Sequence, residues 1–227
     1  MIVPVWEDDE LVVKLINDLR ELAVEWTRPE LIEWIIVAVR PADAVRNLDR
    51  SGAIRLVECD QPSRGRQQNL GASVARGDLL CFHHADSELR PEHVAALVRV
   101  ARDDSVVGGA FHRRFHPPRM LWREPIVRGI NRLGGPLFGD QSLFVKAAVF
   151  QKMGRFADIP LMEDLEFSRR LRRLGRVELL DPPLWSPPRR KGTWRTAIRN
   201  SALMVLFCLG VSPERLHRWY YHGSRNR

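Results

Sequence analysis

Apolar runs of strand length recur through the first part of the chain, and no other feature constrains its fold as strongly. They are Ile2–Val5, Trp34–Val39, Ile54–Val57 and Leu79–Phe82. Between the first two runs, apolar residues from Leu11 to Ala23 recur at helical spacing. Unbroken apolar strands that alternate with helices are typical of parallel sheets that are covered on both faces. The sequence therefore predicts an α/β domain built on a parallel sheet.

The second part of the chain has more turn residues and shorter strand signals. Three strands and one helix are expected there, at Val106–Phe111, Ser142–Val145, Val177–Leu180 and Glu163–Leu174. Residues 112–133 are basic and interrupted by proline, which predicts a mobile excursion over the site. Ser63–Asn69 predicts a loop that leads into a helix ending near Gly77. We divide the chain into a domain at 1–185 and a helical tail at 186–227.

Charge separates these two parts. The net charge is +8, and residues 186–227 hold nine basic residues and one acidic residue, which accounts for all of it. A neutral body with a cationic tail predicts an anionic partner near the C-terminus.

Other global features indicate the setting of the protein. Cys59, Cys81 and Cys208 have no metal-ligand spacing, which predicts a reducing compartment and no disulfide framework. The first residues are interrupted by acids too early for a signal peptide. The sequence contains no uninterrupted run of about eighteen apolar residues, so we expect no conventional membrane-spanning helix. We therefore expect a cytoplasmic protein, with the inner face of the membrane as one setting for its tail.

The strand Leu79–Phe82 runs into a polar cluster that contains His84 and Asp86. Two residues apart on an extended chain, these side chains point the same way. The strand delivers them to the carboxyl edge of the sheet, where open α/β sheets bind ligands. A carboxylate there can hold a divalent cation against a phosphate-bearing ligand. The simpler explanation is a strand end followed by a solvated turn.

A second acidic cluster, Glu163-Asp164-Leu165-Glu166, opens a predicted helix. Carboxylates at a helix start are favoured by the helix dipole, which is sufficient to explain the cluster. The functional interpretation makes one of them a general base that takes a proton from an attacking hydroxyl.

Together these segments resemble the family 2 glycosyltransferases of the GT-A fold, over about residues 60–222. The motifs that carry the resemblance are Arg64–Ala72, His84-Ala85-Asp86, Phe138-Gly139-Asp140-Gln141, Pro160–Asp164 and Arg170–Gly175. Within the family, the chain looks most like the arsenosugar-biosynthesis-type group. The resemblance implies a Rossmann-like α/β fold with a mixed, mostly parallel sheet flanked by helices.

The resemblance also implies an activity and the residues that perform it. Asp86 stands at the end of the family's metal-binding Asp-x-Asp motif, with His84 at its first position, and would hold Mn²⁺ or Mg²⁺ on the donor's diphosphate. Glu163 and Asp164 match the family's Glu-Asp pair, and Asp164 would be the general base of an inverting transfer. The partners implied are a nucleotide-sugar donor, a uridine diphosphate sugar first of all, and a hydroxyl acceptor that is lipid-linked in many relatives.

Further residues match positions that bind the donor in the family. Arg64, Arg66 and Asn69 match the loop that meets the nucleotide, and Asp140 and Gln141 lie where donor sugar or acceptor is held. Arg189 and Arg190 are candidates to neutralise the leaving diphosphate, because a guanidinium group binds phosphate in a bidentate way. A solvated loop explains the arginine pairs equally well.

The N-terminal third departs from the family pattern. The first strand runs into Trp6-Glu7-Asp8 instead of Asn-Glu, and the second runs into Arg40-Pro41-Ala42-Asp43 instead of an Asp-rich turn whose acid contacts the base. Asp43 sits late for that contact, and Arg40 has the opposite charge. A second hypothesis is therefore a non-catalytic binding protein with a degenerate donor pocket.

Two further alternatives concern the relatives and the tail. A nucleotidyltransferase is disfavoured because its glycine-rich N-terminal loop is absent, and nucleic-acid binding is disfavoured because the body is neutral and lacks a reader motif. The apolar stretch Ala202–Val211, flanked by basic residues, predicts either a helix lying in a membrane interface or a C-terminal helix packed on the sheet.

Overall fold

The computed structural model describes residues 1–6, 10–16, 32–46, 54–115, 123–132, 134–186 and 194–222. In these ranges the strands are β1 (Ile2–Trp6), β2 (Trp34–Val39), β3 (Ile54–Cys59), β4 (Leu79–Phe82), β5 (Val106–Phe115), β6 (Leu143–Lys146) and β7 (Arg176–Ser186). The helices are α2 (Asp43–Arg46), α3 (Arg64–Val74), α4 (Pro91–Ala101), α5 (Arg123–Arg132), the 3-10 helix η3 (Gly139–Gln141), α6 (Ala147–Lys152), α7 (Glu163–Arg172), α8 (Trp194–Cys208) and α9 (Pro213–His222). Residues 10–16 are also helical.

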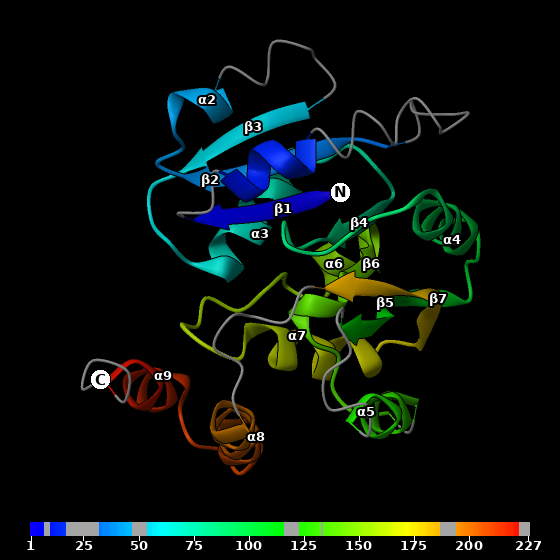
Figure 1. The fold of residues 1–227 in the computed structure, drawn as a ribbon. Helices are drawn as coiled ribbons and strands as arrows, with labels where there is room; N and C mark the ends of the chain where they lie inside the picture. The colour runs from blue at the N-terminus through cyan, green and yellow to red at the C-terminus, as the bar shows by residue number, and fades with distance from the viewer. Residues whose placement is uncertain are drawn as a thin grey trace.

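One seven-stranded sheet crosses the molecule in the order β3-β2-β1-β4-β6-β5-β7 (Figure 1). The pairs β3–β2, β2–β1, β1–β4 and β5–β7 are parallel, whereas β6 is antiparallel to both of its neighbours. The mixed, mostly parallel sheet expected from the sequence is therefore confirmed. The carboxyl ends of β1, β2, β3 and β4 lie along one edge.

Helices cover both faces of the sheet because successive strand residues point to opposite sides. In β2, Ile35 and Val37 enter a core with α3, α6 and α7, whereas Ile36 enters a core with residues 10–16 and α4. All six residues of β2 are buried. This double burial explains why the strand has no polar alternation in its sequence.

Helix α3 packs unusually close to the sheet through Gly71. A Cβ atom at this position would lie 2.5 Å from Ile2 Cγ2 and 2.9 Å from Val37 Cγ2. Glycine at this position thus allows α3 to lie close against β1 and β2.

Two segments expected as loops belong to regular elements. Ser63–Asn69, predicted as a loop, forms the start of α3: the hydroxyl of Ser63 accepts a hydrogen bond from Arg66 N at 3.4 Å as the helix cap. Burial of Gln67 and Gln68 against the sheet outweighs the weak helix propensity of the stretch.

The excursion predicted at residues 112–133 is also partly wrong. Strand β5 continues to Phe115 because the long strand β7 offers it partners up to Ser186, and Arg123–Arg132 forms α5. Residues 116–122 and 133 lie outside the described residues.

The tail forms two helices at the periphery, α8 and α9, which Figure 1 shows apart from the sheet. Leu203 is buried, but Leu209 is 76% exposed, and neither belongs to a core cluster of the sheet. The alternative of a C-terminal helix packed on the sheet therefore does not hold at Leu209. No helix of the described residues is long and apolar enough to cross a membrane.

Candidate active site

Three segments from distant parts of the sequence meet at the carboxyl edge: the turn after β4, the 3-10 helix η3, and the first turn of α7. Asp164 of α7 joins the last two, since its Oδ2 atom accepts a hydrogen bond from Gly139 N at 2.8 Å. Its Oδ1 atom accepts one from Leu165 N at 2.8 Å. Two amide donors thus fix the orientation of this carboxylate.

Gly139 marks the point where the predicted residues converge. A Cβ atom at Gly139 would lie 3.5 Å from Asp164 Oδ2, 3.5 Å from His84 Nε2 and 3.8 Å from Arg64 Nη1. The sequence placed Arg64, His84 and Asp164 in one site on separate motifs. The structure brings all three around one backbone position, with a carboxylate, an imidazole and a guanidinium group within reach of the same ligand.

Burial raises the pKa of both carboxylates at the start of α7. Desolvation raises the pKa of Glu163, which is 8% exposed, and the neighbouring charge of Asp164 adds to the rise. Desolvation also raises the pKa of Asp164, against the opposing effects of its hydrogen bonds to Gly139 and Leu165 and of the Arg64 charge. A carboxyl group whose pKa is raised toward neutrality is a better general base than an exposed one.

The residue before this pair, Met162, has a left-handed backbone with a φ of 68°. Ser142, directly after η3, is also left-handed with a φ of 50°. Non-glycine residues in this region are strained and are concentrated at functional sites. Both strained residues border the loops that meet at Gly139.

Asp86 and His84 lie together in the turn after β4. His84 Nδ1 is 3.9 Å from Asp86 Oδ1, and the Asp86 side chain is 28% exposed, while that of His84 is 8% exposed. Among the described residues, no group of three or more His, Cys, Asp or Glu side chains forms a metal cluster. Mg²⁺ and similar ions are often held by one or two carboxylates together with substrate phosphates. The donor set at Asp86 fits a cation of that kind, carried with a diphosphate.

His83, which the sequence interpretation missed, connects this turn with Ser142, the residue after η3. The ring is fully buried, with Nδ1 2.7 Å from Ser142 Oγ and Nε2 3.1 Å from Ser87 O. Because a carbonyl only accepts, Nε2 carries the proton and Nδ1 accepts from the serine hydroxyl. Burial lowers the pKa of His83 to about 4, so the ring is neutral at physiological pH. No local pattern distinguishes His83 from His84, since only the fold brings the His83 ring to Ser142.

Arg66 and Asn69 of α3 hold the segment that precedes α7. Arg66 forms a double hydrogen bond with Asp158, with N–O distances of 2.8 and 2.7 Å. The amide of Asn69 donates to Phe156 O at 2.9 Å and accepts from Phe156 N at 3.0 Å. Both polar atoms of the Asn69 side chain thus contact backbone.

Asp140 and Gln141 of η3 differ in exposure and partners. Gln141 is buried and donates to Phe111 O at 3.1 Å and to Asn131 Oδ1 at 3.2 Å. Asp140 is partly exposed and forms an ion pair with Arg113 of β5. Arg113 is a second residue that sequence reasoning missed, because 27 positions separate it from Asp140 and no motif links them. Arg189 and Arg190 lie outside the described residues.

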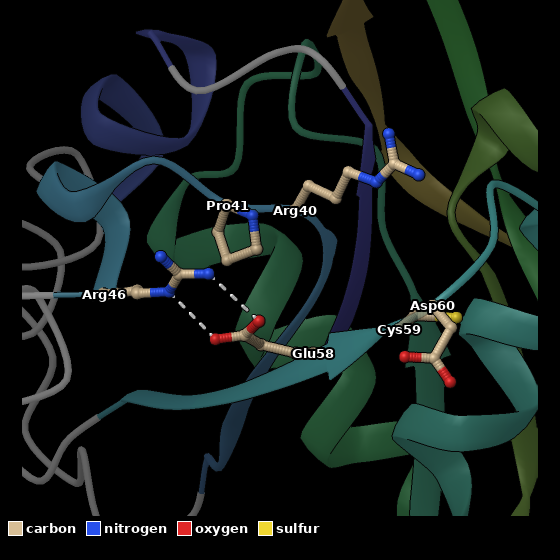
Figure 2. A pocket seen from close by; sticks show the side chains of 6 residues that line it. All are labelled: Arg40, Pro41, Arg46, Glu58, Cys59 and Asp60. Carbon is tan, nitrogen blue, oxygen red and sulfur yellow. Dashed lines mark hydrogen bonds and ion pairs between the residues drawn. The ribbon is translucent and has the colours of Figure 1, made fainter.

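A pocket of about 530 Å³ opens at the carboxyl ends of β2 and β3 (Figure 2). Its lining residues are Arg40, Pro41, Arg46, Glu58, Cys59 and Asp60. Arg46 forms a double hydrogen bond with Glu58, with N–O distances of 3.0 and 3.2 Å, and the Arg40 side chain points away from this pair (Figure 2). The pocket therefore lies where the sequence departs from the family pattern.

A mostly parallel sheet with carboxylates and a guanidinium group gathered at its carboxyl edge defines a ligand-binding α/β domain of the GT-A type. The model of glycosyl transferase family 2 matches residues 1–158. The chain therefore belongs to this family of glycosyltransferases. A comparison with curated protein sequences finds no match.

Solved structures share the fold at low sequence identity. The mannosyltransferase PcManGT from Pyrobaculum calidifontis, in complex with GDP-Man and Mn²⁺, superimposes with a TM-score of 0.69 at 18% identity, over 97% of this chain and 68% of its own. S. aureus TarS 1–349 in complex with UDP-GlcNAc gives a TM-score of 0.65 at 13% identity, over 86% of this chain and 60% of its own. The chain thus spans about three fifths of the length of TarS 1–349.

Proposed function

We propose that this chain transfers a sugar from a nucleoside-diphosphate donor to an acceptor hydroxyl, with inversion at the anomeric carbon. The observation that supports this most is the convergence of Asp164, His84 and Arg64 around Gly139. The family membership and the nucleotide sugars bound by PcManGT and TarS support the class of donor.

In this proposal Asp164 is the general base, with Glu163 beside it. The acceptor hydroxyl gives its proton to the Asp164 carboxylate while its oxygen bonds to the anomeric carbon. The bond between that carbon and the phosphate oxygen breaks, and its electron pair leaves with the nucleoside diphosphate. The amides of Gly139 and Leu165 hold the carboxylate in place for the attack.

The leaving diphosphate needs positive charge near the site. Arg64 lies beside Asp164 and supplies a guanidinium group, and Arg189 and Arg190 stay predictions for the same role. Asp86, with His84, would hold Mn²⁺ or Mg²⁺, which supplies charge to the diphosphate when bound. PcManGT, which shares the fold, was solved with Mn²⁺.

The pocket at β2 and β3 is the proposed site of the nucleoside. It adjoins the first turn of α3, so a ligand there can extend its diphosphate toward Arg64 and Asp86. Arg40 occupies the position where the family pattern has an acid. The carboxylates that line the pocket are instead those of Glu58, in β3, and of Asp60, just after β3. A uridine diphosphate sugar stays the first expectation.

Thermal stability tests the donor site directly. A nucleoside diphosphate at about 100 times its dissociation constant should stabilise the protein by roughly 2.7 kcal/mol, and only fully so when Mn²⁺ is present. A panel of uridine, guanosine, adenosine, cytidine and thymidine diphosphates, each with and without Mn²⁺, identifies the base. Absence of any shift at millimolar nucleotide would contradict the proposed donor site.

Thiol labelling locates the nucleoside. Cys59 lines the pocket and is partly exposed, Cys81 is buried, and Cys208 is exposed on α8. Bound nucleotide should slow the labelling of Cys59 and leave that of Cys208 unchanged, which makes Cys208 an internal control. Equal labelling rates of Cys59 with and without a nucleotide that stabilises the protein would place the nucleoside elsewhere.

The second candidate function is nucleotide-sugar binding without catalysis, which the altered residues after β1 and β2 favour. The two functions differ in turnover: a binder is stabilised by the donor but releases no nucleoside diphosphate from it. The narrower resemblance to the arsenosugar-type group and the identity of the acceptor, lipid-linked or free, stay predictions within the same proposal.

A further inference from the structure

Helix α8 carries a line of exposed aliphatic side chains. Ile198 is 58% exposed, Val205 is 52% exposed, and Leu209, which continues the helix through a hydrogen bond from its N to Val205 O, is 76% exposed. Ile198 and Val205 are seven positions apart, and Val205 and Leu209 are four positions apart. Because each residue turns an α-helix by about 100°, the three side chains lie on one stripe of the helix, within about 40° of each other around its axis.

The stripe faces away from the contacts that α8 makes with α9. Leu203 is 5% exposed and Leu216 of α9 is fully buried, although neither belongs to the core clusters of the sheet. The guanidinium of Arg199 stacks 4.5 Å from the ring centre of Tyr220. Arg199 lies one helical turn from Leu203 and Tyr220 one turn from Leu216, so this contact joins the faces of α8 and α9 that carry the two buried leucines. Leu203 points more than about 100° away from the stripe. Pairing of α8 with α9 therefore leaves the stripe uncovered.

Charge identifies the surface that fits this stripe. The tail holds the whole net charge of +8, and Glu214 is its one acidic residue. Arg215 and Arg218 are exposed on α9. A tail that carries both an aliphatic stripe and an excess of basic residues complements a surface that is apolar beneath an anionic layer, which is the chemistry of an anionic lipid bilayer.

We propose that α8 and α9 dock on an anionic membrane surface, with Ile198, Val205 and Leu209 entering the boundary between head groups and acyl chains. Helix α8 has 15 residues, too few to span a bilayer, so it lies in the interface. Arg215 and Arg218 meet anionic head groups. The proposal goes beyond the reaction, because it concerns where the protein works, and it holds whether or not the chain transfers a sugar.

Co-sedimentation with lipid vesicles tests the proposal on the full chain. Binding is expected to vesicles that contain phosphatidylglycerol and not to vesicles of phosphatidylcholine alone, and to weaken as salt increases. A triple substitution of the stripe, Ile198→Ser with Val205→Ser and Leu209→Ser, should weaken binding at least about tenfold. The double substitution Arg215→Glu with Arg218→Glu should do the same.

Matched variants separate docking from general changes in polarity and charge. Leu174→Ser removes an exposed leucine just after α7, and Arg169→Glu with Arg173→Glu makes the same charge change around the end of that helix. Both should leave vesicle binding unchanged. Because the stripe residues are exposed, the thermal midpoint of the triple variant should stay close to that of the native chain.

Three results would overturn the proposal. The first is no binding to phosphatidylglycerol vesicles at low salt, and the second is binding that the stripe variant leaves unchanged. The third is a native chain that is a dimer by light scattering and that the triple variant converts to a monomer, with no vesicle binding by either. That last result would assign the stripe to an interface between two copies of this chain.

Discussion

The two ends of the carboxyl edge hold their side chains in different ways. At the end formed by β4, η3 and α7, His83 is fully buried, Glu163 is 8% exposed, and Asp164 accepts two backbone hydrogen bonds. At the end formed by β2 and β3, the paired Arg46 and Glu58 side chains are 47% and 53% exposed. Groups fixed by burial suit proton transfer, whereas exposed groups suit a contact that varies between donors. In the proposed function, this contrast separates the end that would perform the reaction from the end that would select the donor.

The substitution expected to break the buried end most is Asp164→Asn. It keeps the shape of the side chain but removes the proposed base, so turnover should fall about 10²–10⁴-fold while nucleotide binding stays nearly intact. Steady-state kinetics together with nucleotide titration measure the two effects separately. Full turnover by this variant on an identified substrate pair would show that another group is the base.

Asp86→Ala should act on the same end through the cation. Loss of the carboxylate is expected to weaken Mn²⁺-dependent nucleotide binding by at least about tenfold, because it removes the proposed ligand of the cation. Calorimetric titration of nucleoside diphosphate with and without Mn²⁺ gives the comparison. Asp60→Ala, in the open pocket, serves as the control and should leave the Mn²⁺ dependence in place.

His83→Phe tests whether the buried bridge organises the site. It leaves the Ser142 hydroxyl and the Ser87 carbonyl without this partner, at a cost of about 1–3 kcal/mol for each buried group. Both stability and Mn²⁺-dependent affinity should fall. The matched variant is His93→Phe, since His93 is equally buried, accepts from Arg90 N at 2.9 Å and lies outside the site. The His93→Phe variant should lower stability but leave the Mn²⁺-dependent affinity for nucleotide unchanged. An equal loss of this affinity in both variants would mean that His83 has only a structural role.

Glu163→Gln tests the raised pKa of the buried carboxyl. As the pH rises above about 4.3, the Glu163 carboxyl loses its proton in the unfolded chain but keeps it in the folded chain, where its pKa is raised. The free energy of unfolding therefore falls until the pH passes the pKa of Glu163 in the folded chain. Glutamine does not titrate. The melting temperature of the variant relative to the native chain should therefore rise between pH 4 and pH 7, by about 2–4 °C for each kcal/mol. Glu214→Gln, at an exposed position on α9, is the control. A relative melting temperature that falls toward neutral pH would contradict the raised pKa.

Arg46→Ala should have the smallest effect. Ion pairs between exposed side chains contribute little to stability, so the melting temperature should stay unchanged within error. Nucleotide affinity should fall by less than about tenfold, because the guanidinium lines the proposed nucleoside pocket and is not among the residues proposed to bind the diphosphate. A loss as large as that of Asp86→Ala would remove the contrast between the two ends.

Local sequence patterns determined much of the architecture. The apolar runs at Trp34–Val39 and Leu79–Phe82 appear as strands β2 and β4 with the predicted bounds, because burial on both faces leaves an unbroken apolar signal. The charge cluster at Glu163-Asp164 begins α7 as expected, since acids favour a helix start. Motif order also predicted Arg64, His84 and Asp164 for one site, and the three side chains lie near one another around Gly139; their roles stay predictions.

Tertiary structure alone decided the rest, because the deciding contacts join residues that are far apart in the chain. The stretch at Ser63–Asn69 becomes helix through burial against β1 and β2, and β5 lengthens because β7 is there to pair with it. His83 and Arg113 acquire partners 59 and 27 positions away, in Ser142 and Asp140. A pattern of neighbours encodes which residues are apolar and where a helix begins; it does not encode which distant side chain completes a hydrogen bond.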